Sequence, residues 1–386
     1  MASTSAEVFA SRGAVDDAVI DALVDAPATE LFGELIEPLS DAFEPAFVDV
    51  YVSVFSRVLE RLGVGSASSL AARFARLSSV ASSFEPRRVV VLSRVTLGAD
   101  IAITSTLLRA AALRWPSAEI VFAGPRKNHE LFAGDARIGL LEVPFQRMGS
   151  LRERVATGLA LRFSDDTLVI DPDSRISQLG LLPLADASRV LFFPSRSVGG
   201  PDDSLVSLTR AFAVSALGVS AAPWIAPPSP EWVPSADVAV SFGVGENAAK
   251  RIDDDFEIGL VQGLLDRRLK VLLDSGAPGS AEAERAARIE ATCRGALFIW
   301  QGSFAPFAAA IARSRFYVGY DSAGQHVAAA CGVPRLTVMA VHPNARFAAR
   351  WRPDGSGASI VVFEPGLVWE GVEAVMGQAY AGPRPR

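Results

Sequence analysis

Two blocks of alternating strand-like and helix-like segments, separated by a cluster of prolines, limit what this 386-residue chain can fold into. Such alternation predicts a doubly wound α/β sheet, because short β-branched runs are typical of buried parallel strands. Five prolines within 223–234 exclude a helix or an interior strand there, so we place a domain boundary at this cluster. The expected strands are 89–92, 119–123, 167–170 and 189–193 before the cluster, and 237–242, 269–273, 296–299, 316–319 and 336–339 after it.

The domain organisation follows from these patterns. The N-terminal region holds apolar residues at helical spacing but no convincing strand, which predicts a helical extension. Two Rossmann-like α/β domains follow, and ligands of such domains usually bind in the cleft between them. The predicted segments are the extension (1–85), the first domain (86–226), the proline-rich linker (227–234), the second domain (235–345), and a C-terminal segment with a tail (346–386).

The composition of the chain argues against several classes of protein. A formal net charge of −6 offers no basic surface for a nucleic acid. Cys293 and Cys331 lack the spacing of a zinc site or of a disulfide framework, which fits a reducing compartment. The N-terminus has no signal-peptide pattern, and no apolar stretch runs uninterrupted for the length of a membrane span. We therefore expect a cytoplasmic protein whose membrane contact is at most peripheral.

The segment after the strand at 316–319 predicts an anion-binding helix start. The free N–H groups and the positive dipole end of such a helix attract anions, and small residues in its first turn let a diphosphate approach the backbone. A histidine four residues after the capping serine shares its helix face. An ordinary capped helix with a buried histidine is the alternative interpretation. The candidate residues are Asp321, Ser322, Ala323, Gly324 and His326.

A glycine-rich turn after the strand at 237–242 predicts a second anion site. Gly243 and Gly245 allow close backbone approach, and Lys250 supplies a positive charge for phosphate oxygens, although a solvated lysine is the simpler interpretation. The turn also matches half of the dinucleotide fingerprint, with Asp274 ending the next strand. A nicotinamide-dependent oxidoreductase is therefore an alternative function.

Asp100 lies between the first strand of the first domain and the helix that follows it. A carboxylate at the carboxyl end of this strand points into the cleft, where it can take the proton of an attacking hydroxyl as a general base. A helix N-cap is the alternative role, because aspartate is among the preferred capping residues.

Together these segments resemble the family 9 glycosyltransferases, the group that includes the lipopolysaccharide-core heptosyltransferases. The resemblance covers about 88–355. This chain departs from the family in five places. They are the extra Ala99 before Asp100, Thr106 where a proline is usual, Ser-Ala-Gly-Gln-His at 322–326 where Ser-Gly-Pro-Met-His is more common, the segment 339–342 that brings His342 near the expected phosphates, and the N-terminal extension. The motifs that carry the resemblance are Leu97-Gly98-Ala99-Asp100, Ala123-Gly124-Pro125-Arg126, Val169-Ile170-Asp171, the glycine turn with Lys250, Ser275-Gly276-Ala277-Pro278, Asp321-Ser322 through His326, Gly332-Val333-Pro334, and Trp351-Arg352-Pro353.

The resemblance implies a GT-B fold and an inverting, metal-independent glycosyltransferase that needs no cofactor. The first domain would bind the acceptor, which is a small molecule, a glycan or a protein. The second would bind a nucleotide-sugar donor, with a heptose as one candidate sugar. The extension would shape the acceptor site or mediate homo-oligomerisation. A nucleotide-sugar-binding protein without catalytic activity is a further alternative.

The resemblance also implies roles for individual residues. Asp100 would deprotonate the acceptor hydroxyl. Lys250 and the helix start at 322–326 would hold the diphosphate and stabilise the charge that develops on it. Asp321 and His326 would line the donor pocket. The ribose would donate hydrogen bonds to Glu282 or Glu284.

Overall fold

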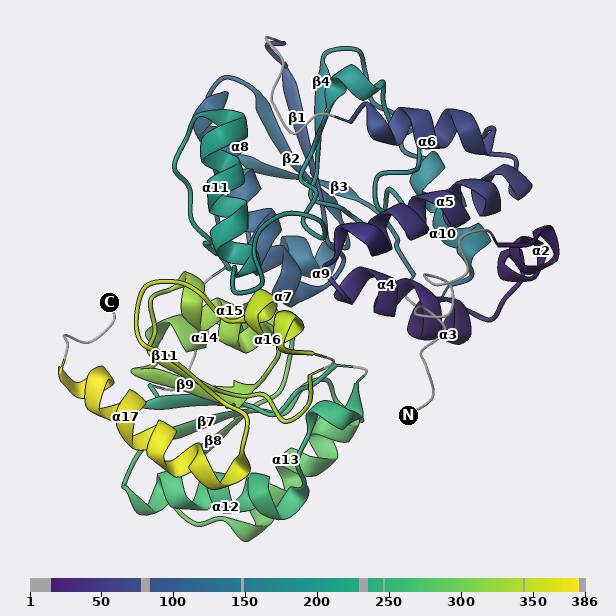
Figure 1. The fold of residues 1–386 in the computed structure, drawn as a ribbon. Coiled ribbons are helices and arrows are strands. Elements are labelled where there is room, and N and C mark those ends of the chain that lie inside the picture. The colour runs from purple at the N-terminus through teal and green to yellow at the C-terminus, as the bar shows by residue number, and fades with distance from the viewer. Residues whose placement is uncertain are drawn as a thin grey trace.

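The computed structural model describes residues 15–77, 84–146, 149–228, 235–245, 247–342 and 344–381. They form two α/β domains, one above the other in Figure 1, and a group of helices beside the first domain. The predicted fold class, two Rossmann-like domains with an N-terminal helical extension, is confirmed. Of the predicted linker 227–234, residues 229–234 lie outside the described residues.

Five parallel strands form the first sheet in the order β3-β2-β1-β4-β5. The strand order reverses between β1 and β4, and ligands of open α/β sheets bind at such switch points, beyond the carboxyl ends of the strands. The strands are β1 (Arg88–Leu92), β2 (Glu119–Gly124), β3 (Ile138–Glu142), β4 (Thr167–Asp171) and β5 (Val190–Phe192). The helices and helical turns are α7 (Leu97–Ala99), η2 (Asp100–Thr104), α8 (Ser105–Arg114), α9 (Arg126–His129), α10 (Leu151–Leu159), η3 (Ala187–Arg189) and α11 (Leu205–Leu217).

Six parallel strands form the second sheet in the order β11-β10-β9-β6-β7-β8, with the switch point between β6 and β9. The strands are β6 (Val238–Ser241), β7 (Val271–Asp274), β8 (Leu297–Trp300), β9 (Phe316–Tyr320), β10 (Arg335–Val338) and β11 (Ser359–Val362). The helices and helical turns are η4 (Ala248–Lys250), α12 (Asp254–Asp266), α13 (Ala281–Thr292), α14 (Phe304–Arg313), α15 (Ala323–Ala330), α16 (Ala345–Trp351), η5 (Pro365–Leu367) and α17 (Val368–Ala381).

The second domain extends past the predicted boundary at residue 345. β11 pairs with β10 as an edge strand of the sheet. Val368, Val372 and Val375 of α17 are buried in the core of this domain, so apolar packing holds the helix against the sheet. The prediction of a separate C-terminal segment is therefore wrong for residues 346–381, and 382–386 lie outside the described residues.

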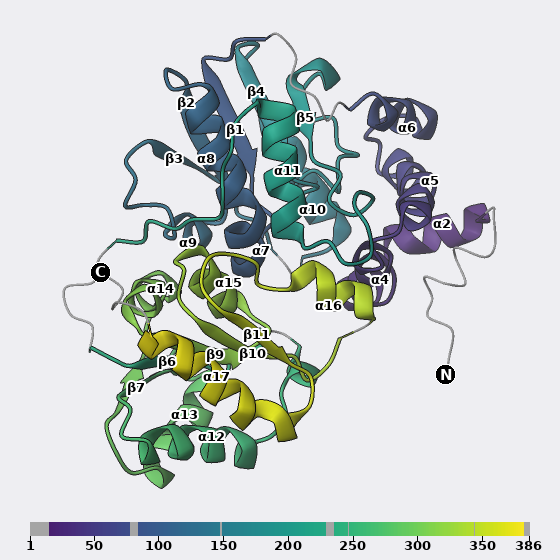
Figure 2. The ribbon, with the colours of Figure 1, turned by 60° about the vertical axis from the view of Figure 1, so that its left-hand side comes forward.

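The described part of the extension consists of helices that pack on the first domain. The apolar face of its longest helix, α5, is buried together with Leu151 and Val155 of α10. The extension also reaches the second domain, where the Phe43 ring lies 6.5 Å from that of Phe347 in α16. Figure 2 shows α4 beside α16. The helices of the extension are α2 (Asp17–Val24), α3 (Ala28–Glu30), η1 (Leu31–Ile36), α4 (Glu37–Asp41), α5 (Pro45–Arg61) and α6 (Ala67–Ala75).

The two domains contact each other directly. A Cβ on Gly98 of α7 would lie only 3.2 Å from Cδ2 of His326 in α15. Arg350 of α16 donates hydrogen bonds to the carbonyls of Val198 (2.7 Å) and Asp203 (3.1 Å) in the loop between β5 and α11. Because α7 follows β1 and α15 follows β9, the carboxyl edges of the two sheets face each other.

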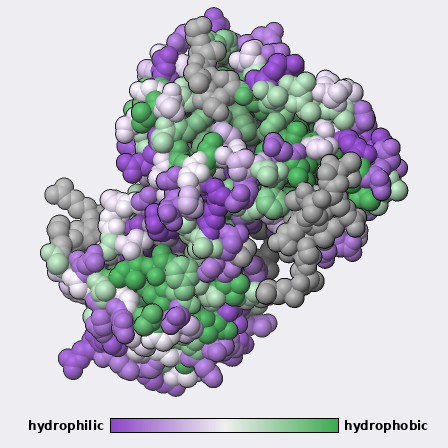
Figure 3. Space-filling view, viewed as in Figure 1, coloured by the Kyte–Doolittle hydropathy of each residue, from purple (hydrophilic) through white to green (hydrophobic). Residues whose placement is uncertain are grey.

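Part of the surface of the second domain is apolar. Figure 3 shows apolar residues gathered where α17 and β11 lie, and the exposed apolar side chains there include Phe363 and Leu367. Within the described ranges, every helix is too short or too polar to cross a lipid bilayer.

Candidate functional site

Helix α15 begins at the carboxyl edge of the second sheet, as the sequence predicts, and the strand order places this start at the switch point. β9 ends at Tyr320, and Ser322 has an extended backbone (φ −155°, ψ −173°) just before the helix. The Ser322 side chain makes no capping hydrogen bond, so it leaves the first-turn N–H groups for another acceptor. Ala323 is half-buried, which keeps part of this turn accessible. The helix start can therefore bind an anion through its N–H groups and its dipole.

Gly324 is the glycine that this helix start requires. A Cβ on Gly324 would lie 2.3 Å from Oη of Tyr317, a side chain that is fully buried under the helix. The tyrosine therefore supports the first turn of α15 from below, and any larger residue at 324 would push the turn away from the sheet.

Lys250 and Asp321 meet across the switch point. Gly245, in the turn before Lys250, has a left-handed backbone (φ +63°) that favours glycine, whereas a Cβ on Gly243 would meet no atom closer than 3.6 Å. The Lys250 ammonium donates a hydrogen bond to Oδ2 of Asp321 at 2.6 Å. The Asp321 side chain is 7% exposed and that of Lys250 is 23% exposed, so the ammonium can still reach a ligand.

A hydrogen bond holds Asp321 independently of Lys250. Gln325, one turn along α15, donates from Nε2 to Oδ1 of Asp321 at 2.5 Å. The carboxylate therefore keeps a partner if the ammonium turns toward a phosphate. The structure thus brings Lys250, Asp321 and the start of α15 into one cluster, and Gln325 is a member that the sequence analysis missed.

His326 lies at the boundary between the two domains. It is 5% exposed, its ring packs edge-on against Trp351 with centroids 6.0 Å apart, and its Nδ1 has no hydrogen-bond partner among the described residues. Desolvation lowers the pKa of His326 to about 4, opposed by the nearby charge of Asp321. The imidazole is therefore neutral at pH 7 and cannot supply a positive charge to a diphosphate.

The structure separates the two candidate ribose ligands. Glu282 is half-buried and, with Asp274, lines a small cavity at the carboxyl ends of β6 and β7. Glu284 is exposed on α13. Of the two, only Glu282 lines this cavity. His342 has local partners, because its Nδ1 lies 3.1 Å from the carbonyl oxygen of Asn344 and its ring packs against Phe363.

The Asp100 carboxylate is enclosed by hydrogen-bond donors. Oδ1 accepts from the backbone N–H of Arg94 (2.6 Å) and from Oγ1 of Thr104 (2.7 Å). Oδ2 accepts from Oγ of Ser93 (2.6 Å) and Nδ2 of Asn128 (2.6 Å). Asp100 is 0% exposed, and burial raises its pKa while these hydrogen bonds oppose the rise. The geometry is that of a group that fixes the turn after β1, and the role of Asp100 as a base stays a prediction.

Charged residues that the sequence analysis did not select gather at the carboxyl ends of β1, β4 and β5. Arg94 donates hydrogen bonds to the Pro172 carbonyl (2.8 Å) and to Oγ of Ser195 (2.7 Å). Arg196 forms a buried ion pair with Asp173 at 2.5 Å. Desolvation lowers the pKa of Arg94 to about 10. The sequence does contain a signal for these residues, because each lies two or three positions after the end of a predicted strand, where polar side chains reach the ligand edge of a sheet.

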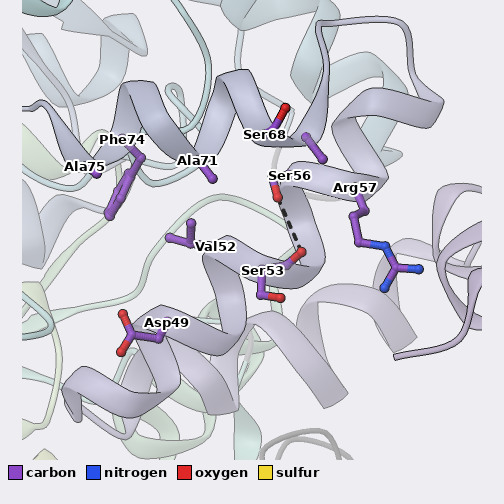
Figure 4. A pocket seen from close by; sticks show the side chains of 10 residues that line it. Asp49, Val52, Ser53, Ser56, Arg57, Ser68, Ala71, Phe74 and Ala75 are labelled. Atoms are coloured by element: carbon purple, nitrogen blue, oxygen red, sulfur yellow. Dashed lines mark hydrogen bonds between the residues drawn. The ribbon is translucent and has the colours of Figure 1, made fainter. Parts of the chain in front are cut away.

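A separate hollow lies within the extension, between α5 and α6 (Figure 4). Small side chains such as Ser53 and Ala71 line it, together with Val52 and Phe74. It contains none of the residues selected from the sequence. Within the described ranges, no three His, Cys, Asp or Glu side chains are grouped so that they could hold a metal ion.

A comparison with known protein families finds a match, and it covers part of this site. Residues 247–360 match the family model of glycosyltransferase family 9 (heptosyltransferase), and this range includes Lys250 and α15. The resemblance predicted from the sequence is confirmed over these residues. No curated protein sequence matches the chain significantly.

Solved structures share the fold. E. coli heptosyltransferase WaaC with ADP has a TM-score of 0.56 and 18% identity, over 75% of this chain and 99% of that chain. E. coli ADP-heptose LPS heptosyltransferase II has a TM-score of 0.54 and 18% identity, over 76% and 99%. A family 9 glycosyl transferase from Veillonella parvula DSM 2008 has a TM-score of 0.53 and 15% identity, over 77% and 91%. The family match supports glycosyltransferase activity, and these neighbours show that the fold is shared.

Proposed function

We propose that this chain transfers a sugar from a nucleoside-diphosphate donor, bound by the second domain, to a hydroxyl group of an acceptor bound by the first domain. One observation carries the proposal: a lysine ammonium and an uncapped helix start meet at the switch point of the second sheet, within the residues that match the family. The closed contact between the two domains supports it, because transfer needs donor and acceptor side by side.

The donor diphosphate would take the place that the Lys250 ammonium faces. On donor binding the ammonium donates to a phosphate oxygen, while Asp321 keeps its hydrogen bond from Gln325. The N–H groups at the start of α15 supply further donors. These groups stabilise the negative charge that grows on the diphosphate as the sugar departs. Because the Lys250 ammonium and the N–H groups of α15 already provide positive charge, we also propose that the transfer needs no metal ion.

Direct transfer would invert the configuration at the anomeric carbon. The acceptor oxygen attacks on the face opposite the diphosphate, the bond to the diphosphate breaks, and the acceptor proton passes to a base. Asp100 is the base that the sequence predicts.

ADP-heptose is the donor to test first. Family neighbours were solved with ADP and with ADP-2-deoxy-2-fluoro heptose, which supports this choice. The nicotinamide alternative is not favoured by the turn at 243–245. In a dinucleotide site that turn opens directly into a long helix, but here a short helical turn, η4, follows and α12 begins only at Asp254.

The test combines binding and turnover. We expect ADP to raise the thermal unfolding temperature of the purified protein, since a ligand that binds only the folded state stabilises it. We also expect release of ADP from ADP-heptose when a carbohydrate acceptor is added. No stabilisation by ADP or by any other nucleoside diphosphate, and no consumption of nucleotide-sugars, would contradict the proposal. Tight ADP binding without transfer would identify a non-catalytic binding protein instead.

A further inference from the structure

Phe43 joins the N-terminal extension to the contact between the two domains. It lies between α4 and α5, its side chain is 1% exposed, and it packs in the apolar core that the two domains share rather than in the core of the extension. Its ring centroid lies 6.5 Å from that of Phe347 and 5.6 Å from Cζ of Arg350, both in α16. Figure 2 shows α4 beside α16 at this junction. The extension therefore inserts a side chain where the first and second domains meet.

The backbone at Phe43 is strained. Its φ is +54°, in the left-handed region that bulky side chains rarely adopt. Such a conformation persists only where the surrounding structure holds it, and strained residues of this kind cluster at functional sites. The buried contacts of the ring hold Phe43 in this conformation. The turn between α4 and α5 thus places a phenylalanine ring in the junction, although glycine would suit the backbone at this position better.

Helix α16 depends on its packing partners for its position. It has only seven residues, and a helix of that length is not stable by itself. Besides Phe43, the extension supplies Glu44, whose carboxylate pairs with Arg346 of α16 at 2.6 Å. The first domain holds the helix through Arg350, which donates hydrogen bonds to backbone carbonyls of the loop between β5 and α11. The extension and the first domain therefore set the position of α16 together.

Helix α16 also contacts the candidate donor site. The Lys250 ammonium lies 5.8 Å from the ring centroid of Phe347, over a ring face that attracts a cation. One turn later in α16, the Trp351 ring packs edge-on against His326 of α15, with centroids 6.0 Å apart. A shift of α16 would therefore displace Phe347, one of the groups that hold the ammonium at the proposed diphosphate position.

We propose that Phe43 is a positioning residue for donor binding. By bracing α16, it holds Phe347, and through Phe347 the Lys250 ammonium, where the donor diphosphate binds. This inference rests on the proposed glycosyl transfer. Phe43 itself would not touch the donor, because its effect passes through α16. The extension thereby gains a role in the donor half of the cleft, whereas the sequence predicted a role at the acceptor site or in homo-oligomerisation.

The experiment measures the ADP dissociation constant by isothermal titration calorimetry in Phe43→Ala and in a matched control, Phe55→Ala. Phe55 is also 1% exposed, but it packs within the core of the extension. Both truncations should lower the unfolding temperature, because each leaves a cavity. We expect Phe43→Ala to weaken ADP binding about 5-fold, and Phe55→Ala to stay within about 2-fold of wild type. Equal ADP affinity in the two variants would overturn the inference.

A double-mutant cycle with Lys250→Met tests whether Phe43 acts through the ammonium. If it does, Phe43→Ala should cause no further loss of ADP affinity in the Lys250→Met background, whereas a general distortion of the site would lower affinity in both backgrounds.

If Phe43→Ala does not fold, the cycle uses Phe43→Leu, which keeps an apolar side chain but loses the aromatic contacts. With either variant, no loss of ADP affinity in the wild-type background, or an equal loss in both backgrounds, would overturn this inference alone. A wild-type protein that binds no nucleoside diphosphate would overturn the proposed function and, with it, this inference.

Discussion

The charge of Lys250 should determine how tightly the protein binds a diphosphate. Lys250→Met keeps an unbranched apolar side chain against Phe347 and removes only the ammonium. A hydrogen bond from a charged group is worth about 1.5–3 kcal/mol. Lys250 is 23% exposed, and it gives up a 2.6 Å bond to Asp321 to reach the ligand, so the lower end applies. We therefore expect a loss of about 1.5 kcal/mol, or slightly more than 10-fold in the ADP dissociation constant.

Isothermal titration calorimetry with ADP at fixed ionic strength measures this loss. The chain has three lysines, and Lys270→Met is the matched control because Lys270 is exposed on the same domain. The control should bind ADP as the wild type does. Raising the salt concentration should weaken binding more in the wild type than in Lys250→Met, since salt screens the lost charge. A Lys250→Met protein that is folded and binds ADP within about 2-fold of wild type would refute this reasoning.

Two further predictions concern α15. Gly324→Ala places a Cβ 2.3 Å from Oη of the buried Tyr317, so urea unfolding should show that the free energy of unfolding falls by about 1–3 kcal/mol. The control is Gly377→Ala, where the new Cβ has no atom within 4 Å and should not lower the free energy of unfolding. Equal stability of the two variants would contradict the packing argument. The pKa of His326 is about 4 in the folded protein, so between pH 6.5 and 4 only the unfolded chain takes up this proton. The free energy of unfolding should fall as pH falls through that window, by up to about 1.4 kcal/mol per pH unit. His326→Gln should lack this contribution to the pH dependence. Plots of unfolding free energy against pH that run parallel in the variant and the wild type would contradict the burial argument.

The sequence predicted nine of the eleven strands and missed β3 (Ile138–Glu142) and β11 (Ser359–Val362), which each lie at one edge of a sheet. Most of their residues are only half-buried or exposed. In β3, Gly139 interrupts the apolar run that marks a buried parallel strand. β11 does carry a short β-branched run, Ile360-Val361-Val362, which the sequence analysis did not count as a strand. Missing β11 also produced the wrong boundary at residue 345.

In the candidate site, local structure could be predicted from the sequence, but contacts between residues distant in the sequence could not. The start of α15 was predictable because a strand, a serine of the type preferred at N-caps and small residues follow one another locally, although the Ser322 side chain makes no capping hydrogen bond. That Lys250 meets Asp321, 71 positions away, depends on β6 lying beside β9, an order that no local pattern states. The enclosure of Asp100 needs Asn128 from a different strand connection. For the extension, the apolar spacing predicts that its helices pack, but it does not predict that Phe43 packs against Phe347 of the second domain.

Mass spectrometry of the acceptor tests the central claim most directly. The purified protein is incubated with ADP-heptose and carbohydrate acceptors, and the modified acceptor and the released ADP are measured together. We predict that the acceptor gains one heptose for each ADP released, and that Lys250→Met slows both at low donor concentration. An ADP-heptose that is neither bound nor consumed, with no other nucleotide-sugar replacing it, would contradict the account.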